Sequence, residues 1–124
     1  MLRGKNILLR SLKDTDINIL EIIENDRKNW KFGSENKIYK RQELRDYIKK
    51  SKTPINIAKQ YRFVIELLAN PIGFIDLFNY KNDSAEVGVI ILNQFRSKGL
   101  ATEALNLIIE YSFNTLQLNH LHCS

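Results

Sequence analysis

The stretch QFRSKGLATE, residues 94–103, holds the residue types best suited to bind an anion. It follows a run of apolar residues and precedes an amphipathic stretch, so we expect a strand, a loop with a glycine and then a helix. The N–H groups at the start of a helix lack partners within it and lie at the positive end of its dipole. Gly99 and Ala101 leave room for a ligand beside the backbone, and Arg96 and Lys98 add positive charge. The stretch therefore predicts a phosphate or pyrophosphate site.

Spacing excludes two common phosphate loops. The Walker pattern ends in Gly-Lys-Ser/Thr, which is missing, and the dinucleotide fingerprint needs three glycines where only Gly99 is present. What remains is the pattern Arg-x-x-Gly-x-Ala at residues 96–101. A basic turn that caps an ordinary helix explains this short pattern as well as a ligand loop does, so the neighbouring elements must decide between the two.

The elements around this loop follow from the periodicity of apolar residues and from turn signals. In chain order, we expect a strand at residues 7–10, a helix after an N-cap cluster at residues 14–16, a weaker helix at residues 41–50, strands at residues 61–67, 71–78 and 84–92, a helix from residue 99 to about 114, and an extended segment from residue 120. Short turns separate the three middle strands, which predicts an antiparallel meander. The last helix should bury one face, formed by Ala101, Ala104, Leu105, Ile108 and Ser112.

This order of elements, together with the Arg-x-x-Gly-x-Ala pattern, resembles the GCN5-related N-acetyltransferase (GNAT) superfamily, in which a Q/R-x-x-G-x-G/A loop follows the fourth strand and binds acyl-CoA. The chain is most similar to the branch that holds ribosomal-protein N-terminal acetyltransferases and spermidine acetyltransferases. The similar stretches are residues 7–16, 24–32, 62–66, 72–77, 84–91 and 110–120. The resemblance implies an α/β fold of the α+β type, with a mixed, largely antiparallel sheet flanked by helices, and one GNAT domain over residues 1–124.

The activity that the resemblance implies is transfer of an acetyl group from acetyl-CoA to a primary amine. A polyamine such as spermidine is one acceptor; the alternatives are a protein N-terminus as acceptor, and an inactive CoA-binding or structural fragment. The resemblance places acetyl-CoA, as co-substrate, beside the loop and beside the fourth strand, where a backbone N–H next to a bulge meets the thioester carbonyl. The residues implied to bind it are Val89, Ile90, Ile91, Arg96, Ser97, Lys98, Gly99, Leu100, Ala101 and Thr102.

Two carboxylates, Asp76 and Glu86, interrupt apolar strands. If the hairpin pairs Phe78 with Ser84, the same register places Asp76 directly opposite Glu86 on one face of the sheet. Two carboxylates at that range suit a proton acceptor or a site for an ammonium group. The resemblance implies that acids at both positions line a polyamine site, so Glu86 and Asp76 are the predicted catalytic residues. The alternative is that this face of the hairpin is wet and both acids are simply solvated.

The sequence ends at Ser124, whereas the superfamily continues past its fifth strand into a helix, with a tyrosine that protonates the CoA thiolate, and then a hairpin. The resemblance therefore implies an acyl-CoA N-acyltransferase fold that lacks its C-terminal helix and hairpin, with no general acid among the residues present. We expect the apolar face of the last helix to be partly open at Leu105, Ile108 and Ile109, beside an unpaired strand edge. A second copy of the chain should pack there, so a homo-oligomer is predicted.

Composition separates few classes of protein. A length of 124 residues with 44% hydrophobic residues predicts one domain. The formal net charge of +5 permits nucleic-acid binding, and residues 27–32 combine basic and aromatic side chains. The other Lys and Arg residues are interspersed with acids, as on an ordinary surface, so we expect no nucleic-acid partner. No apolar run is long enough to span a membrane and no signal-peptide core is present, so we expect a cytoplasmic protein without a membrane partner.

The sequence offers no recognisable metal site. Cys123 has no second thiol with which to form a zinc site or a disulfide, and we expect it to be a half-buried strand residue. His120 and His122 lie at the end of the chain and are predicted to be strand residues rather than a catalytic pair. We therefore expect no metal ion and no side-chain nucleophile.

Overall fold

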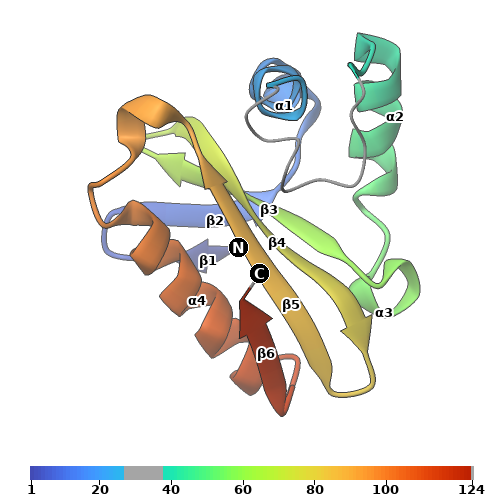
Figure 1. Ribbon diagram of the computed structural model, residues 1–124, viewed down its shortest axis with the longest axis vertical. Helices are drawn as coiled ribbons and strands as arrows, with labels where there is room; N and C mark the ends of the chain where they lie inside the picture. Colours follow the sequence, from blue (N-terminus) through green and yellow to red (C-terminus); the bar gives the residue numbers. More distant parts are fainter. Residues whose placement is uncertain (27–37, 124) are drawn as a thin grey trace.

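A six-stranded sheet lies at the centre of the computed structural model, which describes residues 1–26 and 38–123 (Figure 1). The strands, in the order in which they lie in the sheet, are β1 (Leu2–Arg3), β2 (Ile7–Ser11), β3 (Tyr61–Leu67), β4 (Asn70–Lys81), β5 (Ser84–Ile91) and β6 (His120–Cys123). The helices are α1 (Ile17–Glu24), α2 (Arg41–Lys50), α3 (Ile55–Ala58) and α4 (Leu100–Asn114), with 3-10 turns at η1 (Asp14–Asp16) and η3 (Asn93–Phe95). The basic and aromatic stretch at residues 27–32 lies outside the described residues.

Neighbouring strands pair antiparallel from β1 to β5, and β5 pairs with β6 in parallel. Tight turns join β3 to β4 and β4 to β5, which confirms the predicted meander. The α4 helix makes the crossover from β5 to β6, since a parallel pair needs a connection long enough to return to the same end of the sheet. The sheet therefore has the mixed, largely antiparallel character that the sequence predicts.

Helices cover both faces of the sheet, with α4 on one face and α1 and α2 on the other (Figure 1). Successive strand residues point to opposite faces, so Val64 packs with residues of α1 and α2 while its neighbour Ile65 packs with residues of α4. The α1–α2 cluster also contains Leu20, Ile48 and Phe74, each at most 1% exposed. These two apolar layers hold the helices that carry the candidate site in place on the sheet.

The α4 helix buries the face that the sequence predicts, with Ala104, Ile108 and Ser112 at 0% exposure. The expectation that Ile108 would be left open is therefore wrong, because the strands of the described sheet already cover it. Leu105 is partly buried against the same cluster. Ile109 is the most open of the three residues expected to be exposed, at 36%.

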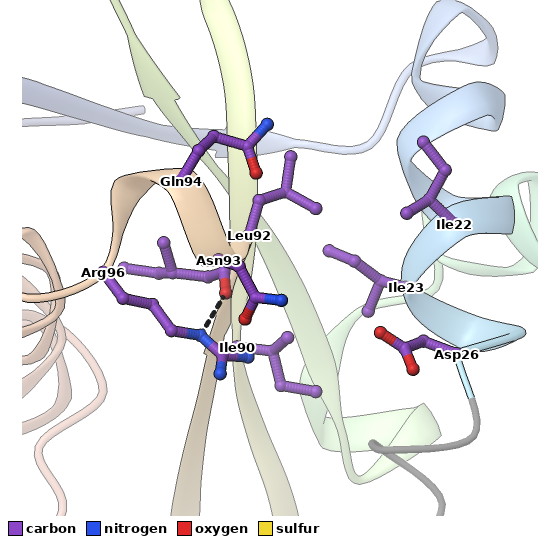
Figure 2. Close-up of a pocket in the computed structure, with 9 residues that line it drawn as sticks. Ile22, Ile23, Asp26, Ile90, Leu92, Asn93, Gln94 and Arg96 are labelled. Atoms are coloured by element: carbon purple, nitrogen blue, oxygen red, sulfur yellow. Dashed lines mark hydrogen bonds between the residues drawn. The ribbon is translucent and has the colours of Figure 1, made fainter.

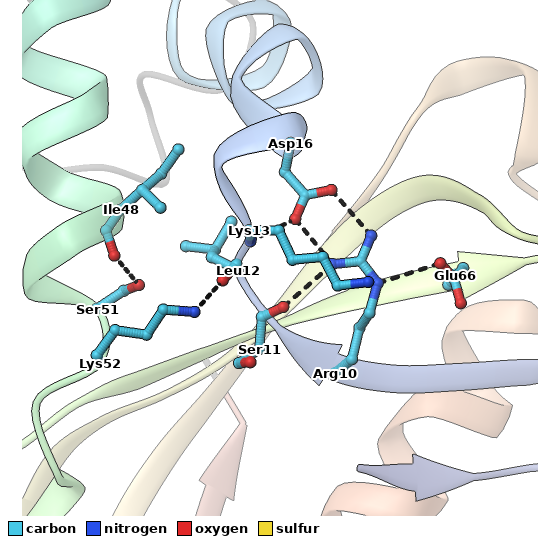
Figure 3. A network of polar contacts seen from close by, with 9 residues as sticks. All are labelled: Arg10, Ser11, Leu12, Lys13, Asp16, Ile48, Ser51, Lys52 and Glu66. Atoms are coloured by element: carbon cyan, nitrogen blue, oxygen red, sulfur yellow. Dashed lines mark hydrogen bonds and ion pairs between the residues drawn. The ribbon is translucent and has the colours of Figure 1, made fainter.

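The acidic cluster before α1 does not cap this helix in the predicted way. Asp14–Asp16 forms a 3-10 turn, and the Asp16 side chain makes no cap hydrogen bond to α1. Its carboxylate instead accepts hydrogen bonds from Arg10 Nη1 and Nη2 at 2.8 and 2.9 Å, and from the Lys13 N–H at 2.8 Å (Figure 3). Asp16 is 2% exposed, and Arg10 also pairs with Glu66 of β3 at 3.1 Å. A buried ion pair thus fixes the entry to α1.

The short elements and the last strand depart from the prediction in detail. The sequence does not predict β1 or α3. Cys123 is exposed rather than half-buried, because β6 lies at the edge of the described sheet. Among residues 1–26 and 38–123, no helix is long and apolar enough to cross a membrane. The same residues contain no group of three or more His, Cys, Asp and Glu side chains that could hold a metal ion.

Candidate active site

The loop before α4 has the backbone shape expected of an anion site. Gly99 adopts a left-handed conformation, with φ 76°, and α4 begins at the next residue, Leu100. The first hydrogen bond of the helix runs from the Glu103 N–H to the Gly99 carbonyl at 3.1 Å. The N–H groups of Leu100, Ala101 and Thr102 therefore precede the intrahelical ladder and lie at the positive end of α4. A Cβ added at Gly99 would meet nothing within 4 Å, so the approach to this backbone is open.

The two cations predicted beside this loop lie in different places. Lys98 is exposed and directly precedes Gly99. The Arg96 Nε instead donates to the Ile91 carbonyl at 2.9 Å, which turns this guanidinium toward the end of β5 (Figure 2). Ser97 has a φ of 63°, an angle that few residues with a side chain adopt. Binding of a pyrophosphate by this loop stays a prediction, for which the open helix start and Lys98 supply suitable groups.

Within the described residues, β6 pairs with only one part of β5. The register ends at Val87 with Cys123, whereas β5 continues to Ile91. In this part of the chain, the edge of β5 is therefore open along residues 88–91. Val89 lies in this part of β5 and is 39% exposed.

The backbone of Val89 faces this open edge. The Leu92 N–H donates to the Ile72 carbonyl of β4 at 2.9 Å, and the hydrogen-bonding side alternates along a strand. Leu92 therefore bonds toward β4, and Val89, three residues earlier, directs its N–H and carbonyl away from β4. The bulge expected here is contradicted, because the register of β4 with β5 runs without a break along residues 86–91.

A pocket of about 140 Å³ lies between α1 and the end of β5 (Figure 2). Figure 2 shows Asp26, just after α1, facing the strand end across this pocket from Ile90 and Leu92. The residues that line it are Ile22, Ile23, Asp26, Ile90, Ile91, Leu92, Asn93, Gln94 and Arg96. The lining combines apolar side chains of α1 and β5 with one carboxylate, one guanidinium and two amides. Apolar surface beside the Asp26 carboxylate offers contacts for a ligand that combines an alkyl chain with a positive charge.

Asp76 and Glu86 share a face of the sheet but do not lie opposite each other. Asp76 pairs with Gly88, and Glu86 pairs with Phe78, so the predicted register is wrong by two residues. The physical reason is that β4 continues to Lys81 and turns more tightly than predicted, with a register irregularity between Phe78 and Lys81. Two residues make one full repeat of the pleat, so both carboxylates still point to the α1–α2 side.

Arg62 of β3 holds Asp76 in an ion pair. Its Nε and Nη2 donate to the two carboxylate oxygens of Asp76 at 2.7 and 2.8 Å, and its Nη1 donates to Glu24 of α1. The guanidinium carbon lies 4.7 Å from the ring centroid of Phe74 and 5.6 Å from that of Tyr47. Burial acts to lower the pKa of Arg62, but the attraction of Asp76, Tyr47 and Glu24 outweighs it and raises this pKa well above its ordinary value. Burial raises the pKa of Tyr47 to about 12.

Glu86 lies where β6 joins the sheet. Its carboxylate accepts a hydrogen bond from the side-chain amide of Asn79, and its cross-strand neighbour in β6 is His122. His122 stacks on His120 with 6.3 Å between the ring centroids. Both histidines are strand residues, as predicted. The structure places Glu86 and Asp76 on one face, and their catalytic role stays a prediction.

Sequence reasoning missed Glu24, Asp26 and Arg62. Arg62 interrupts the apolar strand β3 as Asp76 interrupts β4, and opposite charges at facing positions are a known cross-strand pair. That signal, applied to β3 and β4, would have found the Arg62–Asp76 ion pair. Residues 24–32 resemble the family, but no local signal gives Glu24 or Asp26 a role, because their place in the site depends on how α1 packs on the sheet.

Comparison with known proteins gives matches over almost the whole chain. A family model described as an acetyltransferase (GNAT) domain matches residues 6–124. The spermidine N(1)-acetyltransferase of Vibrio cholerae serotype O1 is 29% identical over 122 residues, which cover 96% of this chain and 69% of that protein. The enzyme of the same name from Escherichia coli strain K12 is 29% identical over 119 residues, which cover 94% of this chain and 62% of that protein. The chain therefore spans less than two thirds of the length of the second of these curated relatives.

Solved structures agree with these matches. The crystal structure of a spermidine N-acetyltransferase from Vibrio cholerae in complex with CoA and spermine is 28% identical, with a TM-score of 0.81, and the match covers 97% of this chain and 70% of that one. A probable acetyltransferase with a TM-score of 0.83 is 23% identical, covers 97% of this chain and 70% of that one, and shows the fold alone. A dodecameric spermidine N-acetyltransferase from Vibrio cholerae has a TM-score of 0.76 at 27% identity and covers 97% of this chain and 70% of that one.

These matches confirm the acyl-CoA N-acyltransferase fold and the family that the sequence resembles. Acetyltransferases of the GNAT family use acetyl-CoA as co-substrate, which confirms the class of enzyme and the cofactor that the resemblance implies. The homo-oligomer expected for this chain stays a prediction.

Proposed function

Because this chain belongs to the acetyltransferase (GNAT) domain family, we propose that it holds acetyl-CoA at the α4 loop and acetylates a primary amine bound between α1 and β5. The observation that carries this proposal is the position of Val89, whose backbone faces the open edge of β5 and whose neighbour Ile90 lines the pocket. An acetyl group at this edge and an amine in the pocket would approach each other across one strand. A polyamine such as spermidine is the acceptor that we propose.

The α4 loop and the open edge of β5 offer suitable groups for acetyl-CoA. When bound, acetyl-CoA supplies an acetyl group activated as a thioester. The N–H groups of Leu100, Ala101 and Thr102, with Lys98 beside them, suit its pyrophosphate. The Val89 N–H, directed away from β4, suits the carbonyl oxygen on which negative charge develops during the attack.

Carboxylates gather on the acceptor side although the chain carries a formal net charge of +5. Gly88 lies on the α1–α2 face without a side chain, directly opposite Asp76 and two residues from Glu86. An ammonium group over Gly88 would lie near Asp76 and Glu86, and Asp26 supplies a further carboxylate at the pocket, which supports an acceptor with more than one amine, such as a polyamine.

Acetyl transfer needs a neutral amine, so a group of the protein must take a proton from the ammonium form. Both carboxylate oxygens of Asp76 accept hydrogen bonds from Arg62. Glu86 accepts a bond from the Asn79 amide and keeps further acceptor positions. We therefore assign the removal of this proton to Glu86, directly or through a water molecule.

A screen of amines tests the proposal. Spermidine, aminoglycosides and peptides with a free N-terminus are each mixed with acetyl-CoA, and release of the CoA thiol is followed. We expect spermidine to be acetylated, and Glu86→Gln to lower its kcat/KM by about a hundredfold, as is typical for a lost general base. CoA affinity, measured by calorimetry, should not change.

Glu110→Gln is the matched control, because Glu110 is exposed on α4 away from the site. Full activity of Glu86→Gln would refute the role of Glu86. Acetylation of peptides but not of spermidine would favour a protein N-terminal acetyltransferase. CoA binding without turnover of any amine would favour an inactive CoA-binding fragment.

A further inference from the structure

Arg62 is unusually placed for a charged residue. It lies in β3 between Tyr61 and Phe63, and its side chain is 13% exposed. It carries one positive charge and contacts two carboxylates, Asp76 and Glu24, so the three groups together are left with one negative charge. Burial of a charge to this degree costs free energy of desolvation. The residues that Arg62 contacts indicate what its burial achieves.

The partners of Arg62 belong to three different elements. Asp76 and Phe74 lie in β4, Glu24 is the last residue of α1, and Tyr47 lies in α2. A guanidinium offers five donors in a rigid plane and a flat face for aromatic rings, which a lysine does not. Arg62 therefore joins both helices of this layer to the middle of the sheet.

The link to Glu24 bears directly on the pocket. Glu24 lies between Ile23 and Asp26, both of which line the pocket from the α1 side. The opposite wall, residues 90–94, comprises the end of β5 and the start of η3, and the Leu92 N–H joins it to β4. The width of the pocket is thus the distance between the end of α1 and the end of β5, and the Arg62–Glu24 ion pair ties that end of α1 to the sheet.

We infer that Arg62 is a positioning residue for the acceptor: through Glu24 it sets the α1 wall of the pocket, and through Asp76 it holds a carboxylate beside Gly88. This inference rests on the proposed function, because it names the residue that shapes the acceptor side of that site. The negative charge left on the three groups attracts an ammonium group, and the fixed α1 wall determines where its alkyl chain lies. The proposed CoA site lies at the α4 loop and does not involve Arg62.

The test compares two substitutions of the same kind on one helix. Glu24→Gln removes the charge that holds the end of α1, whereas Glu21→Gln breaks the Arg41–Glu21 pair, whose side chains are 43% and 37% exposed. The amine KM, kcat, the CoA dissociation constant and amide hydrogen exchange at residues 22–26 are measured for both. Glu24→Gln leaves the bidentate Arg62–Asp76 pair intact, so this variant should fold.

For Glu24→Gln we expect the KM for spermidine to rise about tenfold and exchange at residues 22–26 to accelerate by a similar factor, as for the loss of one charged hydrogen bond. kcat and CoA affinity should stay within about twofold, and Glu21→Gln should match the unaltered protein in every measurement. A lowered melting temperature with unchanged KM and unchanged exchange at residues 22–26 would overturn the inference, because Arg62 would then be structural only.

Failure of the proposed function gives a different result. If the unaltered protein acetylates no amine, that function is refuted, and hydrogen exchange still decides whether Arg62 holds the end of α1. Exchange that is equal in Glu24→Gln and Glu21→Gln refutes the inference whatever the activity.

Discussion

Gly99 offers the sharpest test of the loop before α4. Its φ of 76° is left-handed, and a side chain placed there would meet nothing within 4 Å of the protein. Substitution therefore has two separable effects: strain in the backbone, and obstruction of whatever ligand approaches it. Alanine, asparagine and valine at this position distinguish these effects, because asparagine tolerates a left-handed backbone and the other two do not.

The free-energy cost of this backbone strain can be estimated from the φ angle. A left-handed conformation costs a residue with a side chain roughly 1–2 kcal/mol, and no steric term is added because the space around Gly99 is open. Gly99→Ala should then lower the melting temperature by roughly 4–8 °C, at about 4 °C for each kcal/mol. Gly99→Asn should lower it by less, and Gly99→Val by more, since a β-branched side chain is the least tolerant of this backbone angle.

Calorimetry with CoA measures the second effect. If the pyrophosphate lies against the N–H groups after Gly99, a Cβ obstructs it whatever the backbone angle. We expect all three variants to lose CoA affinity, by at least about tenfold even for asparagine, which corresponds to 1.4 kcal/mol. A folded Gly99→Asn protein that binds CoA as tightly as the unaltered chain would refute the assignment of this loop. In that case, any loss of CoA affinity in Gly99→Ala and Gly99→Val would be due to backbone strain.

The remaining predictions concern stability. Asp16→Asn should lower the free energy of unfolding by about 3 kcal/mol, the low end for breaking a buried pair, because Glu66 still faces Arg10. Burial acts to raise the pKa of Asp16, but the hydrogen bonds from Arg10 and the Lys13 N–H outweigh it and lower this pKa below its ordinary value. Folding thus favours the carboxylate, whose contribution is complete above the unfolded pKa of about 3.9 and is lost as the pH falls through the folded-state pKa. Gly73→Ala would place a Cβ 2.2 Å from the carbonyl oxygen of Ile90, so it should cost about 1–3 kcal/mol in thermal unfolding.

Two outcomes would contradict these predictions. The difference in unfolding free energy between the unaltered protein and Asp16→Asn should shrink in acid, and a difference that is constant down to pH 2 would show that the ion pair does not titrate as described. Gly73→Ala should also weaken CoA binding, because Ile90 is adjacent to Val89 in β5. An unchanged melting temperature would mean that β4 and β5 are not as close at Gly73 as the structure shows.

Local features of this chain were predictable because a few adjacent residues decide them. The helix from Arg41 to Lys50 has the bounds that its periodicity predicts. Gly99 marks the start of α4, since glycine is the residue that adopts a left-handed angle at least cost. The alternation of apolar residues likewise placed β3 and β5 to within one residue.

The register of β4 with β5 was not predictable in the same way. Several turns are compatible with the polar residues at 79–83, and each one shifts every later pair. The conformation of the turn decided it: Asn79 and Asn82 take positive φ angles, and the register is irregular between Phe78 and Lys81, so that Phe78 pairs with Glu86. One consequence is that Asp76 lies opposite Gly88 rather than Glu86, whereas its pairing with Arg62 is set by the register of β3 with β4.

The sequence by itself determined the order of the main elements, the glycine turn before α4 and the family, because backbone preference and apolar period act over a few residues. Only the tertiary structure decided that Glu24 meets Arg62 and that Asp26 faces Ile90. Those contacts join residues 38 and 64 positions apart. Their geometry follows from how α1 packs on the sheet, which is set by the summed burial of many side chains rather than by any short pattern.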